Sequence, residues 1–504
     1  MTLNFEYNSS EKIETDGVLI FVSSDNLTTC SSNEYLSAEI STSIKLGINS
    51  KLFFGDYNEQ KTFAISSTQP RIVHLSGLGE LKDMNPEKLR RISAKAIRSI
   101  MDTRVRSLAV LIPNNLSGEF ESGKLITEAL SLGSYQFKKY KTDESDDSRT
   151  SEINVTILDP HQVSSKDDIE RGASIARGTN FTRDLGNTAP NDLTPDDLRQ
   201  VAQDLAETSK GKLKFSYFDE EKMEELGMDM FLGVSKGSEV PGRMIFLEYF
   251  PKGAKQTVAI IGKGITFDTG GISLKAMKSF LGGMDEMKFD MCGGGAVLGI
   301  MKIIYELNIN VNVIGVIAAA ENMPDGKSQK PGDIVKAYNG KTVEIINTDA
   351  EGRLVLGDAL SFTAEHYKPD CMIDLATLTG ACAIALGHFA MGAITNNQSL
   401  CNLLMKSGEE TGDRVWQLPN FPDYAEAMKG TYADLQNSGD GVAGTITAGS
   451  FLENFVNNIP WVHLDIAGTA WGVKTIEYHP NKGATGTGVR LLINSLENLS
   501  EWEH

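Results

Sequence analysis

The sequence predicts an α/β protein made of two α/β domains, the C-terminal one with a mixed, mainly parallel sheet sandwiched between helices. Short apolar runs of strand length alternate with helical segments along the chain, as in βα units. The later apolar runs are nearly continuous, which is typical of strands covered on both faces. The chain has 504 residues, more than one domain usually holds, and 40% of them are apolar, enough for a sizeable core.

The first domain is expected to span residues 1–163. Its strands are predicted from apolar runs such as "GVLIFVSS", and its helix from the amphipathic segment "PEKLRRISAKAIRSIMD". This domain contains no dense group of polar residues, so we assign it no chemistry. The expected strands are 17–24, 71–79, 107–113 and 153–159, and the expected helix is 86–102.

A helix and a turn-rich stretch, residues 164–195, are expected to link the first domain to the second. This stretch contains two prolines and several Asn, Asp and Thr residues, which are typical of turns. The second domain is expected to span residues 196–504, where stronger apolar runs alternate with helices. Its main expected strands are 256–262, 311–320, 341–346 and 371–378, and its main expected helices are 293–307 and 352–367.

The composition disfavours several classes of function. A net charge of -19 argues against a protein that coats nucleic acids, because such affinity comes from clustered Lys and Arg. No apolar run approaches the ~20 residues that span a bilayer, so we expect no membrane partner. The polar, acidic N-terminal sequence does not resemble a signal peptide, and the five scattered cysteines fit a reducing compartment. We therefore expect a cytoplasmic location.

Polar residues follow the predicted strands of the second domain. In an open α/β sheet, ligands bind outside the carboxyl ends of the strands. Two polar clusters follow strands, in "KGITFDTGGISLK" and "NTDAEGR", and a third, "MDEMKFDM", leads into a helix. We expect all three to reach the same edge of one sheet. The polar residues concerned are Lys263, Asp268, Lys275, Asp290, Asp349, Glu351 and Arg353.

A metal site is the simplest explanation for so many acidic residues. Carboxylates a few ångströms apart cannot all ionise without compensation, and divalent cations supply it. Four carboxylates suit two bridged ions better than one four-coordinate zinc. Any one Asp after a strand is more often a cap or turn residue, so the prediction depends on the group as a whole. The four acidic residues are Asp268, Asp290, Asp349 and Glu351.

A nucleotide-binding loop is disfavoured. The segment "GKGITFDTGG" begins like GxGxxG, but Phe267 occupies the place of the third glycine, and the chain has no GxxxxGK[ST]. The basic stretch at residues 88–99 leaves a nucleic-acid-binding regulator as an alternative. That stretch is more simply the solvated face of an amphipathic helix.

Six segments of the second domain resemble the motifs of the M17 leucyl aminopeptidases, also called cytosol aminopeptidases. They are "GKGITFDTGGISLK", "MDEMKFDM", "AENMPDGKSQKPGDI", "NTDAEGRLVLGDAL", "DLATLTGA" and "HLDIAGTAW". "NTDAEGRL" is the signature of that family. The resemblance covers about residues 171–492, whereas the first domain resembles the family only in size and βα pattern. It implies a two-metal aminopeptidase, and a catalytically silent scaffold on the same fold is the alternative.

The resemblance implies a role for each polar residue. A tight metal site would consist of Lys263, Asp268, Asp290 and Glu351. A more exchangeable site would consist of Asp268, Asp349 and Glu351. The ions would be Zn²⁺ or Mn²⁺, with Mg²⁺ or Co²⁺ as alternatives, and a metal-bridging water would be the nucleophile. Lys275 would polarise the scissile carbonyl, and Arg353 would hold a bicarbonate ion as general base.

The resemblance also implies peptide substrates and a homohexamer. A free α-amine could coordinate the tight-site metal, which explains exopeptidase activity, and leucine and other apolar N-terminal residues would be preferred. The apolar side chain would enter a pocket. The candidate pocket residues are Met287, Thr377, Gly380 and Ala467, for each of which ordinary core packing is about as frequent.

Overall fold

The computed structural model describes residues 2–8, 15–27, 38–65, 70–113, 116, 120–142, 152–279 and 282–502. Contacts between Cα atoms group the chain into two compact units. Unit 1 comprises Met1–Asn180 and Lys474–Asn481, and unit 2 comprises Phe181–Val473 and Lys482–His504. The division falls inside helix α5 (Lys166–Asn187). The domain boundaries expected at residues 163 and 195 stay predictions.

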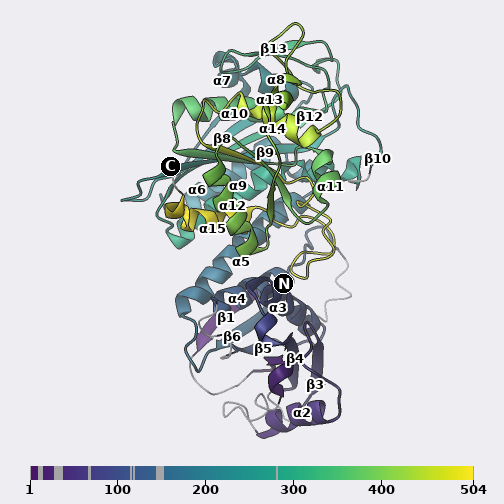
Figure 1. Ribbon diagram of the computed structural model, residues 1–504, viewed down its shortest axis with the longest axis vertical. Helices are drawn as coiled ribbons and strands as arrows, with labels where there is room; N and C mark the ends of the chain where they lie inside the picture. The colour runs from purple at the N-terminus through teal and green to yellow at the C-terminus, as the bar shows by residue number, and fades with distance from the viewer. Residues whose placement is uncertain are drawn as a thin grey trace. The chain divides into compact units, whose positions relative to one another are not determined.

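The sheet of unit 1 has six strands in the order β1-β6-β5-β2-β4-β3 (Figure 1). All neighbouring strands are parallel except β3 and β4, which are antiparallel. The central strand β2 is buried along its whole length, as its continuous apolar sequence predicts. The bounds are β1 (Thr2–Asn8), β2 (Gly17–Ser23), β3 (Gln60–Ala64), β4 (Ile72–Gly79), β5 (Ser107–Leu111) and β6 (Glu152–Leu158).

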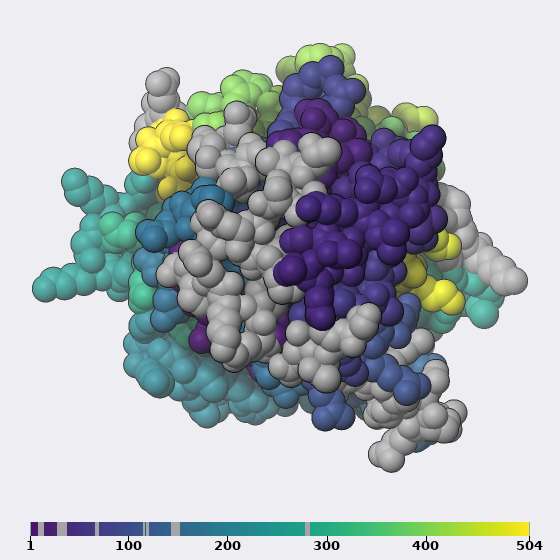
Figure 2. Space-filling model, turned by 90° about the horizontal axis from the view of Figure 1, so that it is seen from below, coloured from purple at the N-terminus to yellow at the C-terminus, as the bar shows by residue number. Residues whose placement is uncertain are grey.

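Helices cover both faces of this sheet. One apolar core lies under α3 (Pro86–Met101) and α4 (Ser122–Gly133), and a smaller one lies under α2 (Ala38–Asn49). The start of α3 is encoded locally, because the Asn85 side chain accepts a hydrogen bond from the Lys88 amide and a proline follows it. In Figure 2, purple and blue residues of unit 1 make up much of the visible surface.

The segment Lys474–Asn481 comes late in the chain but belongs to unit 1. Tyr478 is fully buried there, and its hydroxyl donates to Glu87 Oε1 on α3 over 3.1 Å. The aromatic ring packs in a small apolar cluster with Ala94, Ala129 and Ala176. A late segment thus completes the packing around the helices of the first sheet.

The main sheet of unit 2 has eight strands in the order β17-β16-β19-β15-β9-β12-β8-β7. Its four central strands, β19-β15-β9-β12, are parallel to one another. On one side β16 is antiparallel to β19, and on the other side β8 is antiparallel to both β12 and β7. The bounds are β7 (Leu213–Phe218), β8 (Arg243–Tyr249), β9 (Thr257–Asp268), β12 (Asn312–Asn322), β15 (Cys371–Ala376), β16 (Met391–Thr395), β17 (Val415–Gln417) and β19 (Trp461–Asp465). This mixed, mainly parallel sheet confirms the predicted fold class.

Helices lie on both faces of this sheet (Figure 1). One face carries α6 (Pro195–Thr208), α9 (Cys292–Leu307), α12 (Gln398–Thr411) and α15 (Val489–Glu497). The other carries α8 (Asp229–Ser235), α10 (Gly352–His366) and α14 (Gly444–Glu453), over an extensive apolar core. The shorter helices are α7 (Glu220–Glu225), α11 (Gly380–Leu386) and α13 (Pro422–Glu426).

One predicted strand does not join the large sheet. The segment 341–346 contains β14 (Thr342–Glu344), which pairs with β13 (Ile334–Lys336) and β18 (Leu435–Gln436) in a separate three-stranded sheet. The prediction that segment 341–346 is a strand of the large sheet is therefore wrong, although the polar cluster that follows it still reaches Asp268 at the end of β9. The reason is local, since Ile346 at the end of the run is 44% exposed and cannot lie inside a covered sheet.

Within the residues that the structure describes, no helix is both long enough and apolar enough to cross a bilayer.

Candidate active site

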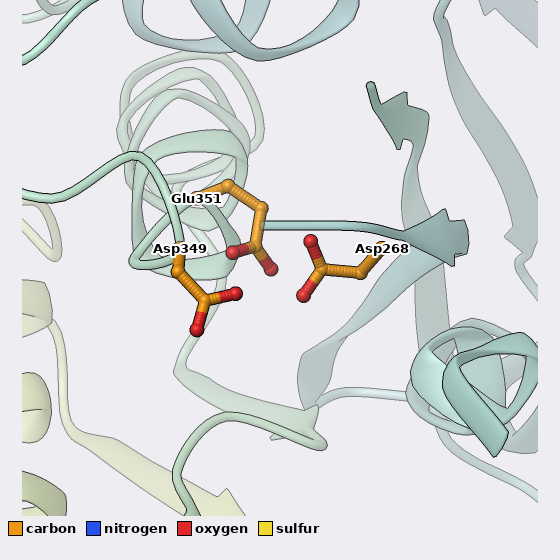
Figure 3. A group of neighbouring side chains, drawn as sticks. All are labelled: Asp268, Asp349 and Glu351. Atoms are coloured by element: carbon orange, nitrogen blue, oxygen red, sulfur yellow. The ribbon is translucent and has the colours of Figure 1, made fainter. Parts of the chain in front are cut away.

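Three carboxylates meet where β9 ends and α10 begins. Asp268 is the last residue of β9, Asp349 lies in the loop before α10, and Glu351 is the residue that precedes α10. One oxygen from each carboxylate lies within 4.8 Å of the others. Figure 3 shows the three side chains pointing toward one another. Asp268 and Glu351 are buried, so their mutual repulsion is poorly screened by water.

Strand β9 is longer than the sequence predicts and carries Asp268 into the site. The predicted strand ended at residue 262, but β9 continues to Asp268 because it pairs with β12 along its length. Asn322 Nδ2 then donates to Asp268 Oδ1 over 2.8 Å, and the Gly270 amide donates to the same oxygen over 2.9 Å. These two hydrogen bonds fix Asp268 Oδ1, and they leave Asp268 Oδ2 oriented toward the site.

The "NTDAEG" loop is a turn held by its own side chains. Asn347 Oδ1 accepts a hydrogen bond from the Asp349 amide at 2.9 Å. The Thr348 hydroxyl donates to the Gly270 carbonyl at 2.6 Å, which ties the loop to the end of β9. A side chain at Gly352 would not fit, because a Cβ there would lie 2.6 Å from Lys263 Cε. The glycine of the motif thus makes room for the lysine.

Lys263 is a buried cation between two carboxylates. Its Nζ lies 2.8 Å from Asp290 Oδ2 and 2.7 Å from Glu351 Oε1, and it donates to the Thr377 carbonyl over 3.1 Å. Burial disfavours the charged amine, but Asp290 and Glu351 outweigh that effect and raise the pKa of Lys263. Without other cations, the lysine is held as ammonium.

Lys275 has the same arrangement on the other side of the site. Its Nζ lies 2.7 Å from Asp268 Oδ2 and 2.5 Å from Asp349 Oδ1. These carboxylates outweigh burial and raise the pKa of Lys275. Burial and the neighbouring Asp268 together raise the pKa of Asp349 to about 7, although Lys275 opposes the shift.

The donor set fits divalent cations. Four carboxyl groups face only two ammonium groups, so the site has an excess of acceptor oxygens. Among the described residues, Glu351 Oε2 is buried and has no hydrogen-bond partner. Carboxylate oxygens that lack donors are the ligands that Zn²⁺, Mn²⁺ and Mg²⁺ accept.

Arg353 lies in the first turn of α10 and is buried. Its Nη1 donates to the Asn437 carbonyl over 2.8 Å. Burial lowers the pKa of Arg353 to about 10, against the opposing effect of Glu351 and Asp465. Arg353 is not among the residues that line the adjacent cavity.

A cavity of about 260 Å³ opens onto the carboxylates. All five predicted metal ligands and Lys275 line it, and so do the four predicted pocket residues, Met287, Thr377, Gly380 and Ala467. The structure thus brings every predicted site residue except Arg353 to this one cavity.

The sequence reasoning missed Met284 and Trp471, which also line the cavity. Trp471 stacks on Phe289 with 5.5 Å between ring centroids, and its indole donates to Glu286 Oε2 over 2.9 Å. The available signals were weak. Trp471 ends the quoted motif "HLDIAGTAW", and Met284 stands three residues before Met287 in the same 3-10 helix, η6 (Met284–Met291).

Comparison with known proteins identifies the chain as a metallopeptidase, which agrees with its acidic cluster and its covered α/β sheet. Residues 180–493 match the catalytic domain of the cytosol aminopeptidase family, and residues 18–144 match its N-terminal domain. The chain belongs to the cytosol aminopeptidase family, and it is an aminopeptidase, a hydrolase of peptide bonds.

Two relatives and one solved structure illustrate the similarity. The chain is 45% identical over 424 residues to a probable cytosol aminopeptidase of Geobacter sp. (strain M21), covering 84% of each. It is 44% identical over 431 residues to the cytosol aminopeptidase of Pseudomonas aeruginosa (strain PAO1), again covering 84% of each. The bottromycin maturation enzyme BotP, solved in complex with Mn, matches with a TM-score of 0.84 at 28% identity, covering 96% of this chain and 99% of that one.

Proposed function

We propose that the chain removes N-terminal residues from peptides with two divalent cations held by its cluster of carboxylates. The observation that carries the proposal is the single cavity in which four carboxyl groups, two lysines and an apolar wall meet. Bound cations supply Lewis acidity and lower the pKa of water, which is the chemistry that peptide hydrolysis needs at neutral pH. The cations would be Zn²⁺ or Mn²⁺, with Mg²⁺ or Co²⁺ as alternatives.

Two overlapping sets of ligands would hold the cations. Asp268 and Glu351 would belong to both sets, Lys263 and Asp290 to the tight site, and Asp349 to the exchangeable one. The contacts of Lys263 with Asp290 and Glu351 support this division, because the amine already lies among the ligands of the tight site. It can ligate a metal only as the neutral amine, so loading that site would release its proton.

Lys275 would stabilise the oxyanion of the tetrahedral intermediate. Its ammonium now lies between Asp268 and Asp349, where the exchangeable cation would bind. With Asp268 and Asp349 holding that cation, the Lys275 ammonium would face the cavity, which it already lines. A charged donor at that place stabilises negative charge as it develops on the scissile carbonyl.

Arg353 would hold the general base. A guanidinium stays protonated at neutral pH, even with its pKa lowered to about 10, so it cannot take a proton itself. Its planar fork suits a bound bicarbonate ion, which would accept the proton of the attacking water. The bicarbonate would bind beside the guanidinium.

The cavity also supports a preference for apolar N-terminal residues such as leucine. Met287, Thr377, Gly380 and Ala467 would receive the side chain, and Trp471 would add an aromatic wall. The free α-amine of the substrate would reach the tight site, which an internal peptide nitrogen could not.

Three expectations remain. The family resemblance implies a homohexamer, and the composition and charge predict a cytoplasmic location with no partner among membranes or nucleic acids. A catalytically silent scaffold or a nucleic-acid-binding regulator stays the alternative, and no observation on the site favours either.

A metal-exchange assay tests the proposal. The protein is dialysed against a chelator and assayed on a panel of aminoacyl amides and dipeptides, each with Zn²⁺, Mn²⁺, Co²⁺ or Mg²⁺ added back. We expect loss of turnover on chelation and recovery with at least one cation, greatest on apolar N-terminal residues. Full turnover in the metal-free protein would overturn the proposal.

A further inference from the structure

The loop that carries Asp349 and Glu351 is held from outside by one residue far away in the sequence. Asn437 follows β18, and its main-chain amide donates to the Glu344 carbonyl over 2.9 Å, which extends the pairing of β18 with β14. The residue is fully buried. Its side chain is therefore placed by the small three-stranded sheet, at the point where β14 runs into the "NTDAEG" loop.

Among the described residues, the side-chain amide of Asn437 makes all its hydrogen bonds with this loop and with Ile346, the residue before it. Its Oδ1 accepts from the amides of Ile346 at 2.7 Å and Asn347 at 3.2 Å. Its Nδ2 donates to the carbonyl of Asn347 at 2.7 Å and, more weakly, to that of Ala350 at 3.4 Å. An asparagine has two donors and two acceptor positions, so the whole capacity of the side chain is used on one turn.

The main chain of the same residue holds the guanidinium. Arg353 Nη1 donates to the Asn437 carbonyl over 2.8 Å, and Arg353 Nε has no hydrogen-bond partner among the described residues. The side chain of Asn437 thus fixes the turn that precedes Glu351, and its carbonyl fixes the group two residues after Glu351. One buried residue sets the distance between the carboxylates and the guanidinium.

We propose that Asn437 is a positioning residue that fixes the metal-binding loop and the Arg353 guanidinium relative to each other. It is not among the residues that line the cavity. The inference rests on the proposed function, in which the loop holds cations and Arg353 holds the base. Misplacing a catalytic group by about 1 Å can cost about 10²-fold in turnover, so a single asparagine can have a large effect from this place.

The first test replaces Asn437 by Asp, which keeps the shape and loses both donors to the loop. We expect kcat on an aminoacyl amide to fall about 10²-fold with KM little changed. We expect the affinity for Mn²⁺ alone, measured by calorimetry on the metal-free protein, to fall about 10-fold. A matched control is Asn396→Asp, because Asn396 also bridges two main-chain groups, at 2.8 and 3.0 Å, but far from the loop. Wild-type kcat and Mn²⁺ affinity in Asn437→Asp would overturn the proposal.

A double variant tests the route of the effect. If Asn437 acts partly through Arg353, Asn437→Asp combined with Arg353→Ala should lose little more kcat than Arg353→Ala alone. Full multiplication of the two losses would overturn the positioning role.

Two further measurements keep the inference decidable. If Asn437→Asp does not fold, hydrogen exchange on the metal-free wild type decides, since the amides of Ile346 and Asn347 should exchange slowly and loop-like rates would overturn the inference. If the wild type shows no metal-dependent peptidase activity, the proposed function fails, and the Mn²⁺ affinity and hydrogen exchange still test Asn437.

Discussion

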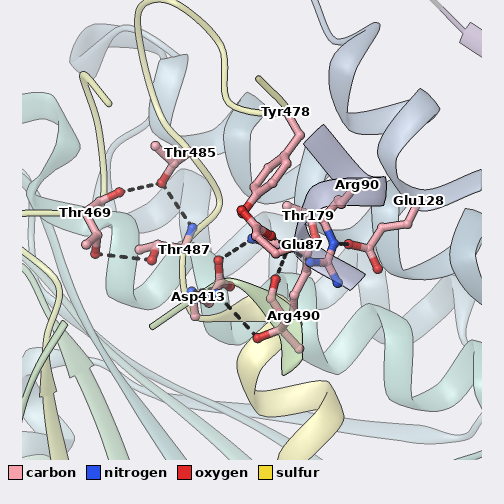
Figure 4. Close-up of polar contacts among 12 residues, drawn as sticks. Glu87, Arg90, Glu128, Thr179, Asp413, Thr469, Tyr478, Thr485, Thr487 and Arg490 are labelled. Atoms are coloured by element: carbon pink, nitrogen blue, oxygen red, sulfur yellow. Dashed lines mark hydrogen bonds and ion pairs between the residues drawn. The ribbon is translucent and has the colours of Figure 1, made fainter. Parts of the chain in front are cut away.

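The two units build similar sheets but treat buried charge in opposite ways. In unit 1, the buried Arg90 lies 2.8 Å from Glu87 and 3.1 Å from Glu128 (Figure 4), and Arg91 lies 2.7 Å from Glu87, so these two glutamates face two arginines. The buried His74 lies between Thr62 and Gln60, and burial lowers its pKa to about 4, which keeps it neutral. In unit 2, four carboxyl groups face two lysines. Buried acidic groups that are paired with basic groups stabilise a fold, whereas carboxylates in excess of the nearby basic groups can bind cations.

Removing one of the excess carboxylates should have the largest effect. Glu351→Ala deletes a ligand shared by both proposed cations, and we expect kcat to fall about 10³-fold or more at saturating Mn²⁺. Glu344→Gln is the control, since Glu344 is also buried, lies on β14 and accepts from the Ala433 amide at 2.7 Å. Steady-state kinetics on an aminoacyl amide measures both. Turnover within tenfold of wild type in Glu351→Ala would contradict the site.

Removing the matched base of unit 1 should affect stability instead. Arg90→Ala takes the buried cation away from Glu87 and Glu128, and we expect unit 1 to lose about 3–5 kcal/mol of unfolding free energy. Arg91→Ala is the control, because Arg91 also pairs with Glu87 but is only partly buried, so its loss should cost less, about 1 kcal/mol. Denaturant unfolding measures both. Equal costs would mean that burial of the pair is irrelevant.

Asp358 gives unit 2 a pH-dependent stability that is independent of the metal ligands. Burial raises its pKa from 3.8 to about 7, although the amides of Phe231 and Tyr338 donate to it. The folded state therefore keeps a proton that the unfolded state loses above pH 3.8. The stability that Asp358 contributes is expected to be fully present below that pH and to be lost as the pH rises to about 7, by up to about 4 kcal/mol.

Replacing Asp358 by Asn should remove this slope. We expect the unfolding free energy of Asp358→Asn to change much less than that of wild type between pH 4 and pH 7, measured by denaturant unfolding at several pH values. Parallel curves for the two proteins would show that Asp358 does not carry the effect.

The smallest predicted effect concerns the late segment of unit 1. Tyr478→Phe keeps the buried ring and removes the hydroxyl that donates to Glu87, so we expect a loss of about 1 kcal/mol. Tyr432→Phe is the control, because Tyr432 is 85% exposed and its loss should be within error. A thermal or denaturant transition of each variant measures the difference, and an unchanged transition in Tyr478→Phe would show that the hydrogen bond adds nothing.

The central strands could be predicted from the sequence because they are apolar throughout. The expected strands 17–24 and 371–378 match β2 and β15 to within two residues. Flanking strands such as β7 and β17 escaped prediction, because their half-exposed sequences lack a continuous apolar run. Strand β9 was predicted too short, since "KGITFD" becomes strand only through pairing with β12.

The metal-binding motifs were visible because each follows a strand or leads into a helix and carries several charges. Long-range hydrogen bonds were not visible. Asn437 lies 90 residues from Asn347 and carries no charge, so only the fold shows that its side chain holds the loop. The sequence also does not show that the lysines pair with the carboxylates, as Lys275 does with Asp349 at 2.5 Å, because such contacts depend on the fold.

The segment Lys474–Asn481 has a consequence for the order in which the protein is made. A ribosome releases the N-terminal part of a chain first, and domains generally fold as they emerge. Unit 1 cannot do so completely, because Tyr478 and the residues around it are synthesised only near the end. During translation, the surface of α3 and α4 stays incompletely packed until nearly all of unit 2 has been synthesised. The packing of unit 1 is therefore completed only after residues 181–473 of unit 2 have been synthesised.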